Sequence, residues 1–135
     1  MSKLMSTSYT TGAFNLATLL MRIGFGGLMM NHGYQKLVNF AAIKPKFMNF
    51  LGMGQGMSLG LVVFAEFFCA LLIIIGLFSR LAAIPIVIVL SVALFKAHKG
   101  LVFGEGEMAA LFLTGFICLL ITGPGKISVD GMSGK

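Results

Sequence analysis

The pattern of apolar residues divides the chain into four long hydrophobic stretches with polar connections between them. The stretches cover residues 14–31, 57–78, 81–95 and 108–122. A helix that crosses a bilayer needs about 20 predominantly apolar residues, and tilt or buried polar ends accommodate somewhat shorter stretches. The pattern therefore predicts an all-α fold, an integral membrane four-helix bundle. We expect a single transmembrane domain over residues 1–135, with helices at about 14–36, 57–78, 81–98 and 107–122.

The connection between the first two predicted helices is long and has a periodicity of its own. Ile43, Phe47, Phe50 and Leu51 recur at helical spacing, and Pro45 suits a first helical turn. This pattern predicts a short amphipathic helix within residues 43–51 that lies in the headgroup region. The connection between the second and third helices is so short that these two must be antiparallel neighbours. Four crossings place both termini on one side of the membrane.

Composition supports the membrane interpretation and narrows the partners. Apolar residues make up 58% of the chain and charged residues 10%, whereas a soluble domain carries about 25% charged residues. The net charge is +6, but the basic residues lie in short loops and at helix ends, which is typical of contact with lipid headgroups. Nucleic-acid binding needs a clustered basic face. We therefore expect the lipid bilayer as a partner and no nucleic acid.

One carboxylate interrupts the second apolar stretch. Glu66 lies inside "VVFAEFFCALLIIIGLFSR", residues 62–80, and Arg22 lies inside the first stretch. Counted from the terminal side, Arg22 is about 12 Å deep and Glu66 about 18 Å deep at 1.5 Å per residue. An ionised group inside a membrane needs a partner, so the sequence predicts an Arg22–Glu66 ion pair. Two interpretations stay open: the pair fixes the helix register, or it forms part of a functional site.

Helical-wheel positions extend this pair into a predicted cavity. One stripe of the first helix carries Arg22, Gly26, Met29, Gly33 and Lys36, and one stripe of the fourth carries Glu107, Leu111, Thr114 and Cys118. Polar groups that face lipid would be unpaired, so we expect these stripes to face inward.

The predicted cavity opens on the side of the bundle away from the termini, with the Arg22–Glu66 pair as its floor. The candidate ligand or proton site residues are Arg22, His32, Lys36, Glu66, Lys96, His98 and Glu107, with Glu105 nearby. Each has a plainer alternative: the histidines as interfacial hydrogen-bonding residues, and the two acids of the last loop as solvated groups at a helix N-terminus.

The sequence contains no haem-ligand pair, iron–sulfur cysteine spacing, dinucleotide-binding loop or HExxH motif. We therefore predict no metal site and no intrinsic cofactor. Cys69 and Cys118 form no CxxC motif, so their redox state stays open. Apolar walls with a histidine and a carboxylate suit a quinone, while Arg22, Lys36 and Lys96 suit a small oxyanion. No catalytic residue is assigned.

Five segments, taken in order, resemble the DoxX family of four-helix bacterial membrane proteins. They are "LLMRIGFGGLMMNHGYQKL" (19–37), "AEFFCALLIIIGLFSRLAA" (65–83), "FKAHKG" (95–100), "EMAALFLTGF" (107–116) and "GPGKISVD" (123–130). The order and spacing of these segments make the match specific, although each alone is weak. The resemblance implies that these positions of the chain match the family's motif residues: Arg22, Gly33, Lys36, Glu66, Gly76, His98, Glu107, the turn Gly123-Pro124-Gly125, and Asp130.

The resemblance implies a function in membrane redox chemistry. Some members of the family resemble the small subunit of a thiosulfate:quinone oxidoreductase, and others are associated with superoxide and thiol detoxification. The implied function is a membrane subunit of a quinone-linked oxidoreductase or detoxification complex that acts on small sulfur or thiol compounds. Its partner would be another membrane or peripheral protein, or a second copy of the chain.

Related eukaryotic proteins are membrane chaperones, so the alternative is a non-catalytic assembly or small-ligand-binding subunit. Whether the chain is an enzyme stays open. The resemblance also implies a location in the bacterial cytoplasmic (inner) membrane, with both termini in the cytoplasm.

Overall fold

The computed structural model describes residues 2–49, 52–97 and 99–134, and the regular elements in these ranges are helices. This confirms the predicted all-α fold. The elements are α1 (Ser2–Met5), α2 (Thr11–Val38), α3 (Phe40–Ile43), η1 (Lys44–Lys46), α4 (Gln55–Val63), η3 (Phe64–Cys69), α5 (Ala70–Ile75), α6 (Ser79–Val92), η4 (Ala93–Ala97), α7 (Glu107–Thr122) and α8 (Val129–Met132).

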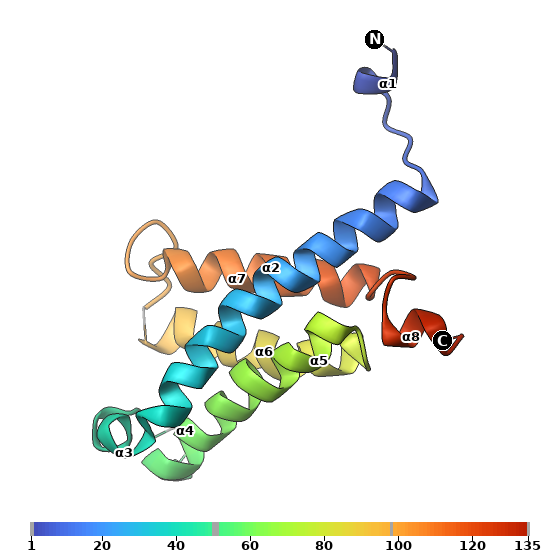
Figure 1. Ribbon diagram of the computed structural model, residues 1–135. Helices are drawn as coiled ribbons and strands as arrows, with labels where there is room; N and C mark the ends of the chain where they lie inside the picture. Colours follow the sequence, from blue (N-terminus) through green and yellow to red (C-terminus); the bar gives the residue numbers. More distant parts are fainter. Residues whose placement is uncertain (1, 50–51, 98, 135) are drawn as a thin grey trace.

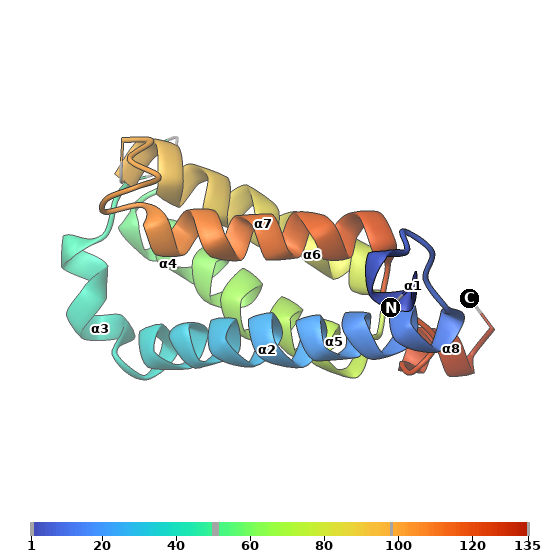
Figure 2. The same ribbon diagram turned by 90° about the horizontal axis from the view of Figure 1, so that it is seen from above.

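Four helical rods lie side by side and form the bundle (Figure 1). The rods are α2, the continuous run α4–η3–α5, the run α6–η4, and α7. The most extensive packing joins α6 to α7, and α2 packs against η3 and α5. Both chain ends lie at the end of the bundle where α2 begins and α7 ends (Figure 2). We call this the terminal end, and the opposite end, which carries α3 and the α6–α7 connection, the loop end.

The second and third rods are joined by a turn built on left-handed backbone. Gly76 ends α5 with φ +76°, and the amides of Gly76 and Leu77 donate to Ile73 O and Leu72 O. Glycine is favoured there because this conformation carries no Cβ penalty for it. Phe78 also has positive φ, at 50°. The second rod therefore ends three residues before the predicted boundary, whereas α7 has the predicted bounds.

The connection after α2 differs from the predicted surface helix. Helical structure is present as one α turn and one 3-10 turn over residues 40–46, and Phe47 is already extended, with ψ 154°. Phe50 and Leu51, which the prediction used, lie outside the described residues. Within the described part of residues 43–51, helical structure therefore ends at Lys46.

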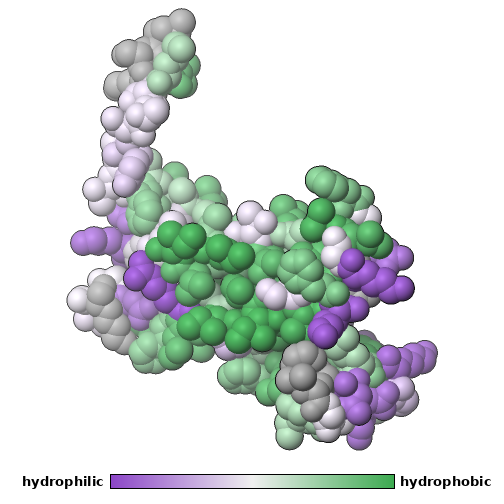
Figure 3. Space-filling view, turned by 180° about the vertical axis from the view of Figure 1, so that it is seen from behind, coloured by the Kyte–Doolittle hydropathy of each residue, from purple (hydrophilic) through white to green (hydrophobic). Residues whose placement is uncertain are grey.

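Apolar side chains fill the interior and also cover the outside. Met29, Ile73, Ile86 and Phe116, each at most 2% exposed, belong to the core. Figure 3 shows apolar surface over the middle of the back face, with hydrophilic groups gathered toward both ends. Three rods, at residues 11–38, 55–75 and 79–96, are long and apolar enough to cross a membrane, and α7 is apolar but shorter, at 16 residues. This distribution suits a bilayer as the surrounding solvent.

Candidate functional site

The buried carboxylate of Glu66 pairs with Lys36. Both carboxylate oxygens accept hydrogen bonds from Lys36 Nζ at 2.8 Å. The Glu66 side chain is 6% exposed and the Lys36 side chain 30%. The pair therefore reaches from the interior toward the loop end. A lysine ammonium has three donors, so one N–H of Lys36 is left for water, a headgroup or a ligand.

The predicted Arg22–Glu66 ion pair is wrong. Side chains on a helix lean toward its N-terminus. The second rod begins at the loop end, so Glu66 leans toward that end, and Lys36 on α2 leans back toward the middle of the bundle, where the two meet. Arg22 leans toward the terminal end, away from Glu66. The depth estimate from the sequence ignored these directions.

Arg22 instead ties the C-terminal tail to the end of α5. Its side chain is 1% exposed and donates to Ile74 O at 3.0 Å and to Ile127 O. The last carbonyls of a helix lack intrahelical partners and carry the negative end of its dipole, so a cation is favourable at this place. Gly76 leaves room for the guanidinium, because a Cβ at this position would lie 2.6 Å from Arg22 Nη1.

Asp130 completes this connection from the tail. Its carboxylate accepts hydrogen bonds from the amides of Phe78 at 3.1 Å and Ser79 at 3.2 Å, and its own amide donates to Gly76 O. It thus caps the N-terminus of α6 from about fifty residues away in sequence. Periodicity does not reveal this role; the segment "GPGKISVD", which carries the family resemblance, was the signal that pointed to Asp130.

A π-helical segment and a glycine set the geometry around Glu66. Glu66 belongs to η3, and single π turns inside α-helices occur often at functional sites. Gly33 lies directly against it: a Cβ on Gly33 would lie 2.7 Å from Glu66 C and Phe67 N. Gly26, earlier on the same face of α2, packs against Ile74 and Ala70 in the same way. These glycines let α2 approach the second rod closely enough for the ion pair to form.

The predicted stripe of α2 is confirmed, and that of α7 is wrong. Arg22, Gly26, Met29 and Gly33 are buried. On α7 the predicted residues Glu107, Thr114 and Cys118 are exposed, and the buried face carries Phe112, Phe116 and Leu119 among others. The Thr114 hydroxyl donates to Ala110 O at 2.9 Å in its own helix. A satisfied hydroxyl can face lipid, so the rule that polar side chains must point inward did not apply.

The other predicted site residues do not gather in a cavity. Lys96 and Glu105 are exposed at the loop end, and Glu107 is exposed in the first turn of α7, where the helix dipole favours an acid. His32 is half-buried between α2 and α7, with its ring edge-on to Phe112 at 5.8 Å between centroids. His98 lies outside the described residues. The described residues thus bring together Lys36 and Glu66 and separate the rest.

Two cavities in the structure differ in their lining from the predicted one. One, of about 520 Å³, is at the terminal end and is bounded by the start of α2, the turn before α6, the end of α7 and the tail. Among the described residues, neither this cavity nor the next one has His32 or another predicted site residue in its lining, so neither is the predicted polar cavity. The other, of about 310 Å³, lies between the α4–η3 rod and α6. We call them the terminal cavity and the apolar cavity.

The apolar cavity has almost no polar lining. Its walls are Phe47, Met48, Met53, Ser58, Leu61, Val62, Phe64, Ala65, Pro85, Ile88, Val89 and Val92. The one hydroxyl among them, that of Ser58, donates to Gly54 O at 2.7 Å. Across the described ranges, no group of three or more His, Cys, Asp or Glu side chains is placed to hold a metal ion. The arrangement can therefore bind an apolar ring or chain.

Comparison with known proteins connects this architecture to one family. The model of the DoxX family matches residues 17–99. The chain is also similar to the Inner membrane protein YqjF of Escherichia coli strain K12, with 29% identity over 127 residues, which cover 90% of this chain and 95% of the relative. No solved structure matches the chain significantly. The matched range contains most of α2, the second rod and α6, and with them the Lys36–Glu66 pair and the apolar cavity.

Proposed function

The chain belongs to the DoxX family, and from this premise we propose that it is a multi-pass inner-membrane subunit that holds a quinone-class lipid for a partner oxidoreductase. The name of the E. coli relative supports the location, and the apolar exterior between two hydrophilic ends supports the multi-pass topology. The partner would carry the redox chemistry on small sulfur or thiol compounds. We place both termini in the cytoplasm, as the family resemblance implies.

The apolar cavity is the observation that carries this proposal. Its volume of about 310 Å³ is at the lower end of ligand pockets, about 300–1,000 Å³, and is sufficient for a substituted ring and the first part of its chain. Methionine and phenylalanine in the wall adapt to a flat ring. Leu61, at the cavity rim, is 45% exposed on the outside of the rod, so a lipid-soluble ligand can enter from the bilayer.

The Lys36–Glu66 pair lies beside the cavity but not in it. Ala65 lines the cavity, and the next residue, Glu66, points to the other side of the rod toward α2. In this proposal the pair holds η3 in place, and the cavity supplies the binding. The quinone carbonyls would take their hydrogen bonds from the partner or from water at the cavity rim, since the lining itself is apolar.

The chain has no tryptophan, which permits a direct binding experiment. A Leu61→Trp variant places one fluorophore at the cavity rim, and a Leu20→Trp variant places one on the exposed face of α2. A short-chain ubiquinone analogue is titrated into both purified variants in detergent. We expect saturable quenching for Leu61→Trp and only linear, collisional quenching for Leu20→Trp. Equal saturation at both positions would mean unspecific partitioning and would contradict the proposal.

A blocking variant makes the experiment specific for the cavity. Val62→Phe in the Leu61→Trp background fills part of the volume, so saturation should be lost while the helical circular dichroism is kept. Leu28→Phe, on the exposed face of α2, is the matched control and should leave the saturation unchanged.

One observation favours a second function, the assembly of another membrane protein. A Cβ added to Gly24 or Gly27 on α2 would meet no atom within 4 Å, so both residues face outward, and small residues on a membrane helix let a second helix approach closely. As an assembly subunit, the chain would dock a transmembrane helix of its partner there. Gly27→Leu should then abolish co-purification of a stoichiometric partner after gentle extraction and leave quinone binding unchanged.

A further inference from the structure

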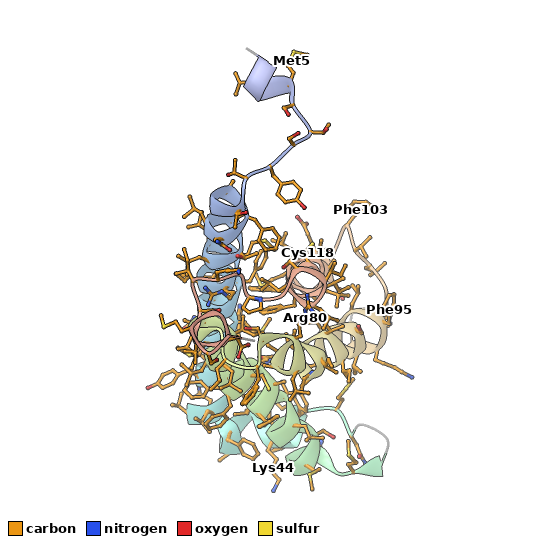
Figure 4. All side chains as sticks on the ribbon, turned by 90° about the vertical axis from the view of Figure 1, so that its right-hand side faces the viewer. Met5, Lys44, Arg80, Phe95, Phe103 and Cys118 are labelled. Carbon is orange, nitrogen blue, oxygen red and sulfur yellow. The ribbon has the colours of Figure 1, made fainter. Side chains whose placement is uncertain are left out.

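The terminal cavity combines positive charge with a buried hydroxyl. It has a volume of about 520 Å³ and is lined by residues from α2, α6, α7 and the tail. The polar groups that matter are Ser79, Arg80, Lys126 and Asp130. Figure 4 looks at this end and shows Arg80 between the end of α7 and the start of α6. The two cations and one carboxylate leave a net lining charge of +1 (2 − 1).

Arg80 is anchored but keeps most of its donors. Its Nη2 donates to Ile121 O at 3.2 Å, near the end of α7. A guanidinium has five N–H donors, so the others are left to face the cavity or water. Gly123 lets the backbone pass close to the guanidinium, since a Cβ there would lie 3.2 Å from Arg80 Nε and Nη2. The fixed fork of an arginine is suited to a tetrahedral oxyanion.

Ser79 supplies a polar atom that needs a partner. The residue is 2% exposed, and its hydroxyl has no hydrogen-bond partner among the residues that the structure describes. Its backbone amide is taken by Asp130, and the residue belongs to the lining of the cavity, so a rotation about χ1 would present the buried hydroxyl to a molecule there. Leaving a buried hydroxyl without a hydrogen bond is unfavourable, so this atom indicates a ligand at this place.

Asp130 does not oppose an anion as strongly as an uncommitted carboxylate would. Both of its oxygens accept backbone amides, from Phe78 and Ser79, at the N-terminus of α6. The amides and the helix dipole stabilise its charge. Lys126, whose amide donates to Asn15 Oδ1 at 3.0 Å, belongs to the tail and also lines the cavity. An oxyanion between Arg80 and Lys126 would therefore meet two cations and one hydroxyl.

We propose that the terminal cavity binds a phosphate-type oxyanion through Arg80, Lys126 and the Ser79 hydroxyl. The cavity is lined by the start of α2, the start of α6 and the end of α7, so it lies at an end of the apolar rods, which is the level of lipid headgroups. Phe14 and Leu81 in its wall suit the glycerol and upper acyl part of a phospholipid. The oxyanion can come from an anionic phospholipid or from a free small ion. This site is separate from the apolar cavity, and its existence does not depend on quinone binding.

The experiment measures ligand-dependent thermal unfolding of the full-length protein in detergent. The probes are phosphatidylglycerol, phosphatidylcholine and inorganic phosphate, and the apparent Kd follows from stabilisation against concentration. The Arg80→Gln/Lys126→Gln variant should raise the Kd for phosphatidylglycerol at least tenfold. The matched control, Lys44→Gln/Lys46→Gln, removes the same charge from exposed positions at the loop end and should leave the Kd unchanged.

Ser79→Ala keeps the charge and separates binding from folding. Because the hydroxyl has no partner among the described residues, its removal should leave the unfolding temperature without ligand unchanged or higher. It should raise the Kd for phosphatidylglycerol about threefold or more, as loss of a charge-assisted hydrogen bond does. This variant also decides the question if the double variant does not fold.

The probes distinguish the two sources of the oxyanion. Stabilisation by phosphatidylglycerol alone, with the expected dependence on the variants, identifies a lipid headgroup, and the same dependence with inorganic phosphate identifies a free ion. The proposal is overturned if Ser79→Ala binds like the parent. It is equally overturned if Arg80→Gln/Lys126→Gln and Lys44→Gln/Lys46→Gln give the same Kd.

Discussion

The Lys36–Glu66 pair predicts an asymmetric response to the loss of either partner. Lys36→Met strands a carboxylate that is 6% exposed, whereas Glu66→Gln strands an ammonium that is 30% exposed. A stranded lysine can extend its stem and move its charge toward the headgroups. A stranded Glu66, fixed in the π-helical segment η3, has no such escape and must stay buried without a partner or take up a proton.

Burial sets the size of the two effects. Breaking a buried pair by removing one partner costs about 3–5 kcal/mol, and exposed pairs are worth at most about 1 kcal/mol. We expect Lys36→Met to lower the free energy of unfolding by about 3 kcal/mol and Glu66→Gln by about 1 kcal/mol. Because apolar residues can replace a buried pair at little cost, Lys36→Met with Glu66→Leu should return to within about 1 kcal/mol of the parent.

The assay is a double-mutant cycle in detergent, with unfolding followed by circular dichroism. Arg22→Met combined with Glu66→Leu is the control, because Arg22 donates to the carbonyls of Ile74 and Ile127 and not to Glu66. This control should show no recovery, since the two carbonyls lose their donor. Recovery in the Arg22 cycle together with none in the Lys36 cycle would refute the assignment of the pair.

Two further predictions concern backbone contacts. Gly33→Ala should lower the free energy of unfolding by about 1–3 kcal/mol through overpacking, because the new Cβ would lie 2.7 Å from Glu66 C. Gly24→Ala, whose Cβ would meet no atom within 4 Å, should be neutral or stabilising. Thermal unfolding of both variants measures these effects, and equal losses of stability would contradict the close approach of α2. Asp130→Ala should lower the free energy of unfolding by about 1–2 kcal/mol, as loss of a helix cap does. The variant should also speed hydrogen exchange at the amides of Phe78 and Ser79, which lose their acceptor. Unchanged exchange at these amides would mean that the tail does not cap α6.

The features of the fold that depend on local pattern could be predicted from the sequence. The apolar stretches become the four rods, and the stripe of α2 that includes Arg22 and Gly33 is buried as predicted. These features follow from the length and period of a helix, which the sequence shows directly. The predicted bounds of α7 coincide with the observed ones because a glycine lies directly on each side of that helix.

The pairing of charges could not be predicted in the same way. Estimated depths placed Arg22 near Glu66, but the direction in which each side chain leans decides which residues meet, and it selects Lys36. The cap of α6 by Asp130 joins segments about fifty residues apart in sequence, and no periodic pattern contains that contact. The predicted gathering of charged residues at the loop end is not observed, because exposed residues such as Lys96 and Glu107 were assumed to face inward.

The most direct measurement of the proposed function is the location of a bound quinone. A photoreactive short-chain quinone analogue is cross-linked to the protein in membranes, and the modified peptides are identified by mass spectrometry with and without excess unlabelled quinone. We expect competed cross-links in residues 61–65 and 85–92, which face each other across the apolar cavity. Competed cross-links at His32 or Glu107 instead, or labelling that unlabelled quinone does not reduce, would contradict it.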